Sequence, residues 1–304
     1  MGLFDKSGTS FKPRYRITDH ILNSLTRATA DKELIAKVHL PPEWITNFHK
    51  EAMLKTAQAS ASIEGHSVDP TEVHRLAASG SEADSFGKQQ VLNCIQVLES
   101  SSTFLKDRQL TEDKFLQIHF LLTENALEKP EFGGVYRKTE PVSSPGQPAD
   151  ILWPAPKAKE VQDLVRGLLT WMNSFEAERV HPVLQAGLTH HEIMRVRPFA
   201  VGNGLLARYL AVLLLYWRNF DARRKFCLDE YYNNDRNAYF QGLKPSDPKK
   251  PDLTGWLEYY ADGVVEDVTR VKDRVLALNA EINRKAETAA EPTPDISPVS
   301  RPPF

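Results

Sequence analysis

The residues best suited to chemistry lie between Arg197 and Arg208, in the run Arg-Pro-Phe-Ala-Val-Gly-Asn-Gly-Leu-Leu-Ala-Arg. Gly202–Gly204 predicts a tight turn, and the apolar run that follows it to Leu215 predicts a helix buried on nearly every face. The start of such a helix leaves backbone N–H groups free at the positive end of its dipole, where a phosphate can bind. Arg208 lies about one turn into this helix, and its planar guanidinium suits a phosphate or a carboxylate. A glycine-rich loop before an ordinary core helix is the alternative interpretation.

The same stretch resembles the signature of the Fic family, His-Pro-Phe-x-Asp/Glu-Gly-Asn-Gly-Arg-x-x-Arg. The resemblance extends through much of the chain, since Ser60-x-x-x-Glu64-Gly65 is similar to the family's N-terminal inhibitory motif. It implies a mainly α fold, a Fic-type helical bundle with one β-hairpin flap. It also implies AMP transfer from ATP to a protein hydroxyl. The signature residues kept in this chain are Pro198, Phe199, Gly202, Asn203, Gly204 and Arg208.

The resemblance assigns a role to each signature position. The histidine is the general base, the acidic residue holds Mg²⁺, and the glycine turn and the arginines hold the phosphates of ATP. Three positions of this chain depart from that pattern. Arg197 stands at the histidine position, Val201 at the acidic position and Leu205 at the first arginine position.

These departures decide what chemistry remains. AMP transfer needs a base that takes the proton of the target hydroxyl, and a positioned base contributes about 10²–10⁴-fold to the rate. Arginine cannot be deprotonated in a protein, so Arg197 cannot act as that base. Valine has no oxygen ligand for Mg²⁺, so Val201 offers no metal site and we assign none. The sequence therefore predicts nucleotide binding with weak or lost AMP transfer.

A helix is expected to run from Pro42 to Glu64 and to stop at Gly65. A carboxylate at a helix C-terminus faces the negative end of the dipole, so Glu64 needs a cation or water. The resemblance implies that this cation is Arg208 and that the pair blocks the position of the ATP γ-phosphate. Ser60 and Glu64 are accordingly predicted to be regulatory, and a solvated Glu64 is the alternative.

Turn formers alternate with strand formers between Glu131 and Pro156, which predicts a β-hairpin. The hairpin resembles the Fic flap, which lies over the active site and clamps the target by strand pairing. Residues 134–154 are therefore the predicted docking site for a protein target, and Ser143 and Ser144 are predicted to line the nucleotide site. A purely structural hairpin is the alternative.

Aromatic and histidine side chains give weaker signals. The segment from Arg236 to Phe240 resembles the family's Arg-x-x-Tyr-Tyr segment, which implies that Tyr239 and Phe240 lie by the adenine. An ordinary core edge explains them equally well. His119 lies among apolar residues and is expected to be a packed core histidine. His190 and His191 are adjacent in a predicted helix and point about 100° apart, so they cannot easily share a metal ion.

The pattern predicts an N-terminal helical region at residues 1–105, a Fic-like core at 106–288 and a disordered tail at 289–304. Within them we expect one long helix at 86–104 and two helices between Leu253 and Leu278. The chain has 304 residues, 41% hydrophobic and 26% charged, which is ordinary for a globular protein. Its net charge of -2 gives no reason to expect nucleic acid or an anionic membrane as a partner.

With no recognisable secretory signal and no apolar run long enough to span a bilayer, a cytoplasmic location is the default expectation. Cys94 and Cys227 are the only cysteines, so no disulfide framework or zinc site is indicated. The expected ligand is ATP, and the sequence leaves a homodimer open. Two functions remain: a weak or altered Fic enzyme, or a pseudoenzyme that binds a nucleotide or a peptide without transfer.

Overall fold

The structure is a computed structural model, which describes residues 11–79, 83–104, 106, 109–141, 153–220, 226–244, 247 and 251–290. Regular structure in these residues is helical, apart from an isolated parallel bridge between Arg14 and Asp252. The α-helices are α1 (Asp19–Lys37), α2 (Pro42–Ile63), α3 (Pro70–Ser79), α4 (Phe86–Glu99), α5 (Ser101–Phe104), α6 (Glu112–Thr123), α7 (Val161–Met172), α8 (Phe175–Glu178), α9 (Pro182–Val196), α10 (Asn203–Trp217), α11 (Leu228–Asn234), α12 (Arg236–Leu243) and α13 (Thr254–Ala290). Short 3₁₀ turns lie at η1 (Pro130–Phe132) and η3 (Ala158–Glu160). The chain is therefore mainly α, as the sequence predicts.

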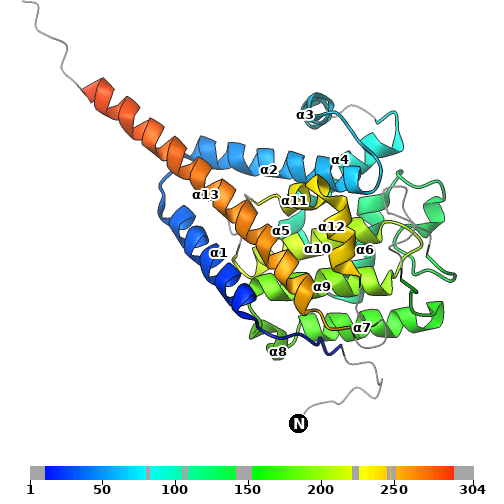
Figure 1. Cartoon of the computed structure of the whole chain (residues 1–304). Coiled ribbons are helices and arrows are strands. Elements are labelled where there is room, and N and C mark those ends of the chain that lie inside the picture. The colour runs from blue at the N-terminus through cyan, green and yellow to red at the C-terminus, as the bar shows by residue number, and fades with distance from the viewer. Residues whose placement is uncertain are drawn as a thin grey trace, which may run out of the picture.

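Helices α9 and α10 form the centre of the molecule (Figure 1). The run that follows Gly204 is buried on nearly every face of α10, including Leu205, Leu206 and Leu210. Each such leucine contributes about 1.5–3 kcal/mol when it is fully buried. Helices α2 and α6 contact α10, while α7 and α13 contact α9, so the loop between α9 and α10 is fixed at both ends in the core.

Helix α2 has the predicted extent. Pro42 occupies its first turn, where a missing N–H costs nothing, and Gly65 just beyond it has φ +97°. Alanines at Ala57 and Ala61 are fully buried, and small side chains allow neighbouring helices to approach closely. Helix α2 packs on α4 and α11, which places its C-terminal end, with Ser60 and Glu64, against α10.

The first and last helices pack side by side, and α13 continues beyond α1 away from the body of the molecule (Figure 1). Arg14 also accepts a backbone hydrogen bond from Leu253 N at 2.8 Å, which ties the segment before α1 to the start of α13. The expectation of two helices between Leu253 and Leu278 is wrong, because one helix runs from Thr254 to Ala290. No proline interrupts this stretch, and strong helix formers dominate its second half, from Lys272 to Ala290.

The expected single helix at 86–104 is also interrupted. Helix α4 ends at Glu99, and α5 begins at Ser101. The Ser101 hydroxyl donates to the carbonyl of Leu98 at 2.7 Å, which offers the backbone an alternative to continued α-helical pairing. No helix in the described part of the chain is long and apolar enough to cross a membrane. The division into an N-terminal region at 1–105 and a core at 106–288 stays a prediction.

Residues 142–152 of the predicted hairpin, with Ser143 and Ser144, lie outside the described residues. The described residues on either side of this segment form a 3₁₀ turn, turns, bends and irregular backbone rather than strands. They are fastened by Arg137, whose backbone N–H donates to Pro198 O at 3.0 Å and whose guanidinium donates to Pro156 O at 2.6 Å. The flap as a strand-like docking site therefore stays a prediction.

Candidate functional site

The loop from Arg197 to Gly202 is shaped by its own residues. Arg197 ends α9 in the left-handed conformation, with φ 44° and ψ 68°. The amide of Asn203 closes the loop, because Oδ1 accepts from Phe199 N and Nδ2 donates to Phe199 O, both at 2.9 Å. Gly202 has φ +74°, and a Cβ there would lie 2.8 Å from the methyl group of Thr123. The Asn203 side chain thus holds the turn together. Glycine is required at position 202 both by its positive φ and by the close approach of the Thr123 methyl group.

The buried ring of His119 holds this loop in place. Its Nδ1 accepts a hydrogen bond from Gly134 N at 3.0 Å, so Nε2 carries the proton and donates to Val201 O at 2.9 Å. Its ring stacks on Phe199 with centroids 3.6 Å apart. Burial lowers the pKa of His119 to about 4, so the ring is neutral at pH 7. His119 is a packed core histidine, as expected, and its positioning of the loop is what sequence reasoning missed.

The side chain of Arg197 contacts Trp153. Its guanidinium donates to the carbonyl of Trp153 and lies 5.8 Å from the centre of the Trp153 ring. The backbone carbonyl of Arg197 accepts from Arg137 Nε at 2.7 Å. Burial lowers the pKa of Arg197, and the neighbouring Arg137 lowers it further, yet a guanidinium stays protonated in a protein. Arg197 is therefore an anchor for the loop and cannot accept a proton there.

Arg208 forms the buried ion pair that the sequence predicts. Its Nη2 donates to Glu64 Oε1 at 2.8 Å and to Ser60 O at 3.1 Å, and its Nε donates to Ser60 Oγ at 2.8 Å. Arg208 and Glu64 are 2% and 3% exposed, so bulk water does not screen the pair. The predicted contact between Glu64 and Arg208 is confirmed, and Ser60 belongs to it.

The Glu64 carboxylate also lies against the first turn of α10. A Cβ placed on Gly204 would lie 2.2 Å from Glu64 Oε1 and 2.9 Å from Arg208 Nη1. The N-cap of α10 is Gly202, which has no side chain to cap the free N–H groups. An anion is thus already seated at the positive end of α10, in the place where a bound phosphate would be stabilised.

Asp229 is the site residue that sequence reasoning missed. Its Oδ1 lies 3.2 Å from Arg208 Nε, and the side chain is 1% exposed. Burial raises the pKa of Asp229, although the positive charge of Arg208 opposes that shift. An acidic residue in the first turn of a helix is common, so the sequence around α11 carries no signal of this contact.

The aromatic residues of the Arg-x-x-Tyr-Phe segment lie in the core. Tyr239 is fully buried, its hydroxyl lies 2.8 Å from His190 Nε2, and its ring stacks on Tyr232 with centroids 4.6 Å apart. Phe240 is 4% exposed. His190 and His191 are buried beside Trp256, with ring centroids 5.2 and 6.1 Å away, so they pack in the core as expected. A role for Tyr239 and Phe240 at an adenine stays a prediction.

Mg²⁺ does not fit the residues of the loop. The side chain of Val201 has no oxygen, and its backbone carbonyl accepts from His119. Among the described residues no group of three or more His, Cys, Asp or Glu side chains is arranged for a metal. A phosphate does fit, because Arg208 already holds the Glu64 carboxylate beside Gly204, and Gly202 gives the N–H groups at the start of α10 no side-chain cap.

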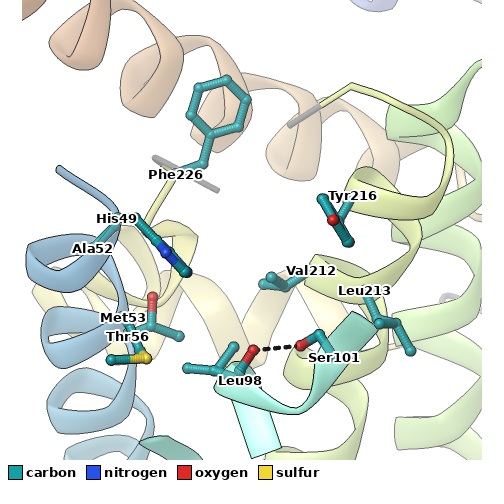
Figure 2. Close-up of a pocket in the computed structure, with 10 residues that line it drawn as sticks. All are labelled: His49, Ala52, Met53, Thr56, Leu98, Ser101, Val212, Leu213, Tyr216 and Phe226. Atoms are coloured by element: carbon teal, nitrogen blue, oxygen red, sulfur yellow. Dashed lines mark hydrogen bonds between the residues drawn. The ribbon is translucent and has the colours of Figure 1, made fainter. Parts of the chain in front are cut away.

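A hollow separates the middle of α2 from the C-terminal half of α10 (Figure 2). It is lined mainly by apolar side chains, including Met53 of α2, Leu98 of α4 and Val212 of α10. Helices α2 and α10 are therefore separated at the middle of α2, and Arg208 of α10 connects them by its contacts with Ser60 and Glu64. The hollow contains none of the signature residues.

Comparison with known proteins agrees with this geometry. Residues 109–215 match the model of the Fic/DOC family. The chain carries a Fic/DOC domain. This domain includes α6, the loop at 197–202 and nearly all of α10, whereas Glu64 lies outside it.

The curated relatives match this chain at low identity. "Protein adenylyltransferase Fic" of Nematostella vectensis is 28% identical over 178 residues, 56% of this chain and 39% of the relative. The protein of the same name from Culex quinquefasciatus is 22% identical over 194 residues, 62% of this chain and 37% of the relative. The chain thus spans less than two fifths of the length of these relatives.

Solved structures share the fold. A Fic family protein from Desulfovibrio desulfuricans G20 has a TM-score of 0.69 and 21% identity, over 94% of this chain and 79% of that one. Fic-1 from C. elegans has a TM-score of 0.67 and 18% identity, over 82% of this chain and 71% of that one. These likenesses extend the Fic fold across most of the chain.

Proposed function

We propose that this Fic/DOC protein binds the phosphates of a nucleotide, ATP by family resemblance, at the N-terminus of α10. Gly202, Gly204 and Arg208 form the binding surface, and Glu64 occupies it in the closed state. The observation that carries the proposal is the Glu64 carboxylate, which is seated on Gly204 and paired with Arg208 at 2.8 Å. A site that already stabilises one buried anion has the donors and the charge to stabilise another.

We also propose that AMP transfer by the natural chain is weak or lost. In that reaction the target hydroxyl oxygen attacks the α-phosphorus of ATP, pyrophosphate leaves, and the hydroxyl proton passes to a base. Arg197 cannot receive this proton, and its guanidinium is engaged by the Trp153 carbonyl. The protein then acts as a nucleotide-binding pseudoenzyme, in which Glu64 controls access to the site.

The partners follow from the same reasoning. A protein target would dock along the flap at 134–154, and a cytoplasmic location would supply the nucleotide. A homodimer is compatible with this proposal and is tested by size-exclusion chromatography with light scattering.

The binding test compares two carboxylates of one helix. Glu64→Ala removes the anion from the proposed site, whereas Glu51→Ala removes a carboxylate that pairs with Arg274 on the surface. Isothermal calorimetry with ATP, ADP, GTP and CDP-choline should show that Glu64→Ala tightens binding of the preferred nucleotide by about tenfold. Glu51→Ala should match the natural chain, and Arg208→Ala should abolish binding. If Glu64→Ala and Arg208→Ala bind every nucleotide equally, or not at all, the proposed site is wrong.

The activity test restores the missing groups one by one. With labelled ATP and mass spectrometry, the natural chain should add little or no AMP to itself or to other proteins. Arg197→His with Val201→Asp and Glu64→Ala should recover self-modification, while omission of Arg197→His should not. Leu205→Arg is best left out, because Leu205 is 1% exposed and a cation there would enter the apolar core. Strong labelling by the natural chain that disappears with Arg208→Ala would refute the loss of activity.

A further inference from the structure

Arg208 has two carboxylate partners rather than one. Glu64 Oε1 lies 2.8 Å from Nη2 of the guanidinium, and Asp229 Oδ1 lies 3.2 Å from its Nε. Ser60 also contacts the guanidinium through its hydroxyl and its carbonyl, whereas Nη1 is buried without a hydrogen-bond partner. Two carboxylates therefore share a single buried guanidinium.

Three further titratable groups that the described structure places near this cluster supply no charge. Burial raises the pKa of Cys94 to about 12, raises the pKa of Tyr239 and lowers the pKa of His190 well below its usual range. All three are neutral at pH 7. Burial alone would lower the pKa of Arg208, but the nearby carboxylates outweigh it and keep that pKa above its usual range. The cluster carries one excess negative charge when both carboxylates are ionised.

The two carboxylates are held differently. Glu64 lies at the C-cap of α2, next to Gly65 with its left-handed backbone. A movement of this helix end can therefore withdraw the Glu64 carboxylate from Arg208. Asp229 lies within α11, which packs on both α2 and α13. Neither oxygen of Asp229 has a hydrogen bond of standard geometry, and the charge of Arg208 is the largest favourable effect that opposes its burial. Withdrawal of Glu64 leaves Asp229 in place.

We infer that Asp229 is a specificity-determining residue of the anion site, a second counter-ion that sets how tightly the site binds phosphate. This inference rests on the proposed nucleotide site. With Glu64 withdrawn, an incoming phosphate meets an Arg208 that Asp229 still neutralises, together with a like charge beside the same guanidinium. Full release of Arg208 requires the loss of both negative charges.

The experiment is a double-mutant cycle on the full chain. Calorimetry with ATP and with inorganic pyrophosphate is carried out on the natural chain, Glu64→Ala, Asp229→Asn and the double variant. Asn keeps the shape of Asp and removes its charge, and Asp229→Ser provides a second route to the same loss. Asp31→Asn is the matched control, because Asp31 is also a buried carboxylate with one cationic partner, Lys272, remote from Arg208 along α1. Urea unfolding establishes that each variant is folded.

The double variant should bind ATP and pyrophosphate about 10–100-fold more tightly than Glu64→Ala alone, as expected for removal of a like charge in a buried site. Asp31→Asn should leave affinity unchanged. Equal affinity of Glu64→Ala and the double variant would overturn the role of Asp229 while leaving the nucleotide site intact. Absence of binding in every variant, the double variant included, would overturn the proposed function and this inference together.

Discussion

Gly204→Ala tests the seat of the Glu64 carboxylate with a single methyl group. Gly204 lies in the first turn of α10 and has no positive φ, so alanine suits its backbone and would by itself favour the helix by about 1 kcal/mol. The added Cβ would lie 2.2 Å from Glu64 Oε1, whereas ordinary contact begins near 3.4 Å. The carboxylate must therefore move by more than about 1 Å, which stretches its 2.8 Å contact with Arg208 to the edge of an ion pair.

Removing one partner of a buried ion pair costs about 3–5 kcal/mol, and a stretched pair loses part of that. After the helix gain, Gly204→Ala should therefore lower the free energy of unfolding by up to about 2–4 kcal/mol. Urea denaturation followed by circular dichroism measures this change. Gly255→Ala is the matched control, because Gly255 is also helical and a Cβ there meets nothing within 4 Å. The free energy of unfolding of Gly255→Ala should rise by about 0.5–1 kcal/mol. If Gly204→Ala is as stable as Gly255→Ala, the carboxylate does not sit on the helix start as described.

Three further predictions concern the loop. Gly202→Ala should lower the free energy of unfolding by about 2 kcal/mol or more, because φ +74° and the Thr123 methyl group both exclude a Cβ; an unchanged urea midpoint would contradict this. Arg137→Lys should lower the melting temperature by several degrees, since one ammonium cannot reach the four backbone carbonyls that the guanidinium binds; equal melting would show those bonds to be dispensable. The free energy of unfolding should fall as pH drops from about 6.5 towards about 4, by at most about 3 kcal/mol for His119. The reason is that His119 binds a proton in this range in the unfolded chain, whereas its folded pKa of about 4 keeps the buried ring neutral. A urea midpoint that does not change between about pH 7 and about pH 4.5 would argue against a buried neutral ring.

Contacts dictated by a motif were predictable from the sequence, and those made by isolated residues were not. Glu64 follows a helix and precedes a glycine at a recognisable spacing from Ser60, so its pairing with Arg208 could be predicted and is confirmed. Asp229 reaches the same guanidinium from α11, and only the packing of α11 on α2 brings it there. Tertiary contacts between single residues of this kind leave no periodic trace in a sequence.

The same distinction applies to the elements. The apolar run of α10 and the proline and glycine that bound α2 predicted both helices, because each signal is local. The break at Ser100 depends on one hydroxyl, Ser101 Oγ, that bonds a preceding carbonyl, and serine does this in many helices without ending them. The hold of His119 on the loop depends on two backbone groups at Val201 and Gly134, and backbone partners are invisible in the side-chain pattern.

The ion pair between Glu64 and Arg208 joins residues that are 144 positions apart, and its acidic member comes first. A ribosome adds roughly 5–20 residues per second, so Glu64 is made many seconds before Arg208. The segment that forms α2, with its carboxylate, has therefore already been synthesised when the glycine turn and α10 are made. Glu64 is therefore present when the anion site at the start of α10 folds. The chain need never pass through a stage in which the completed site is open to cellular nucleotides.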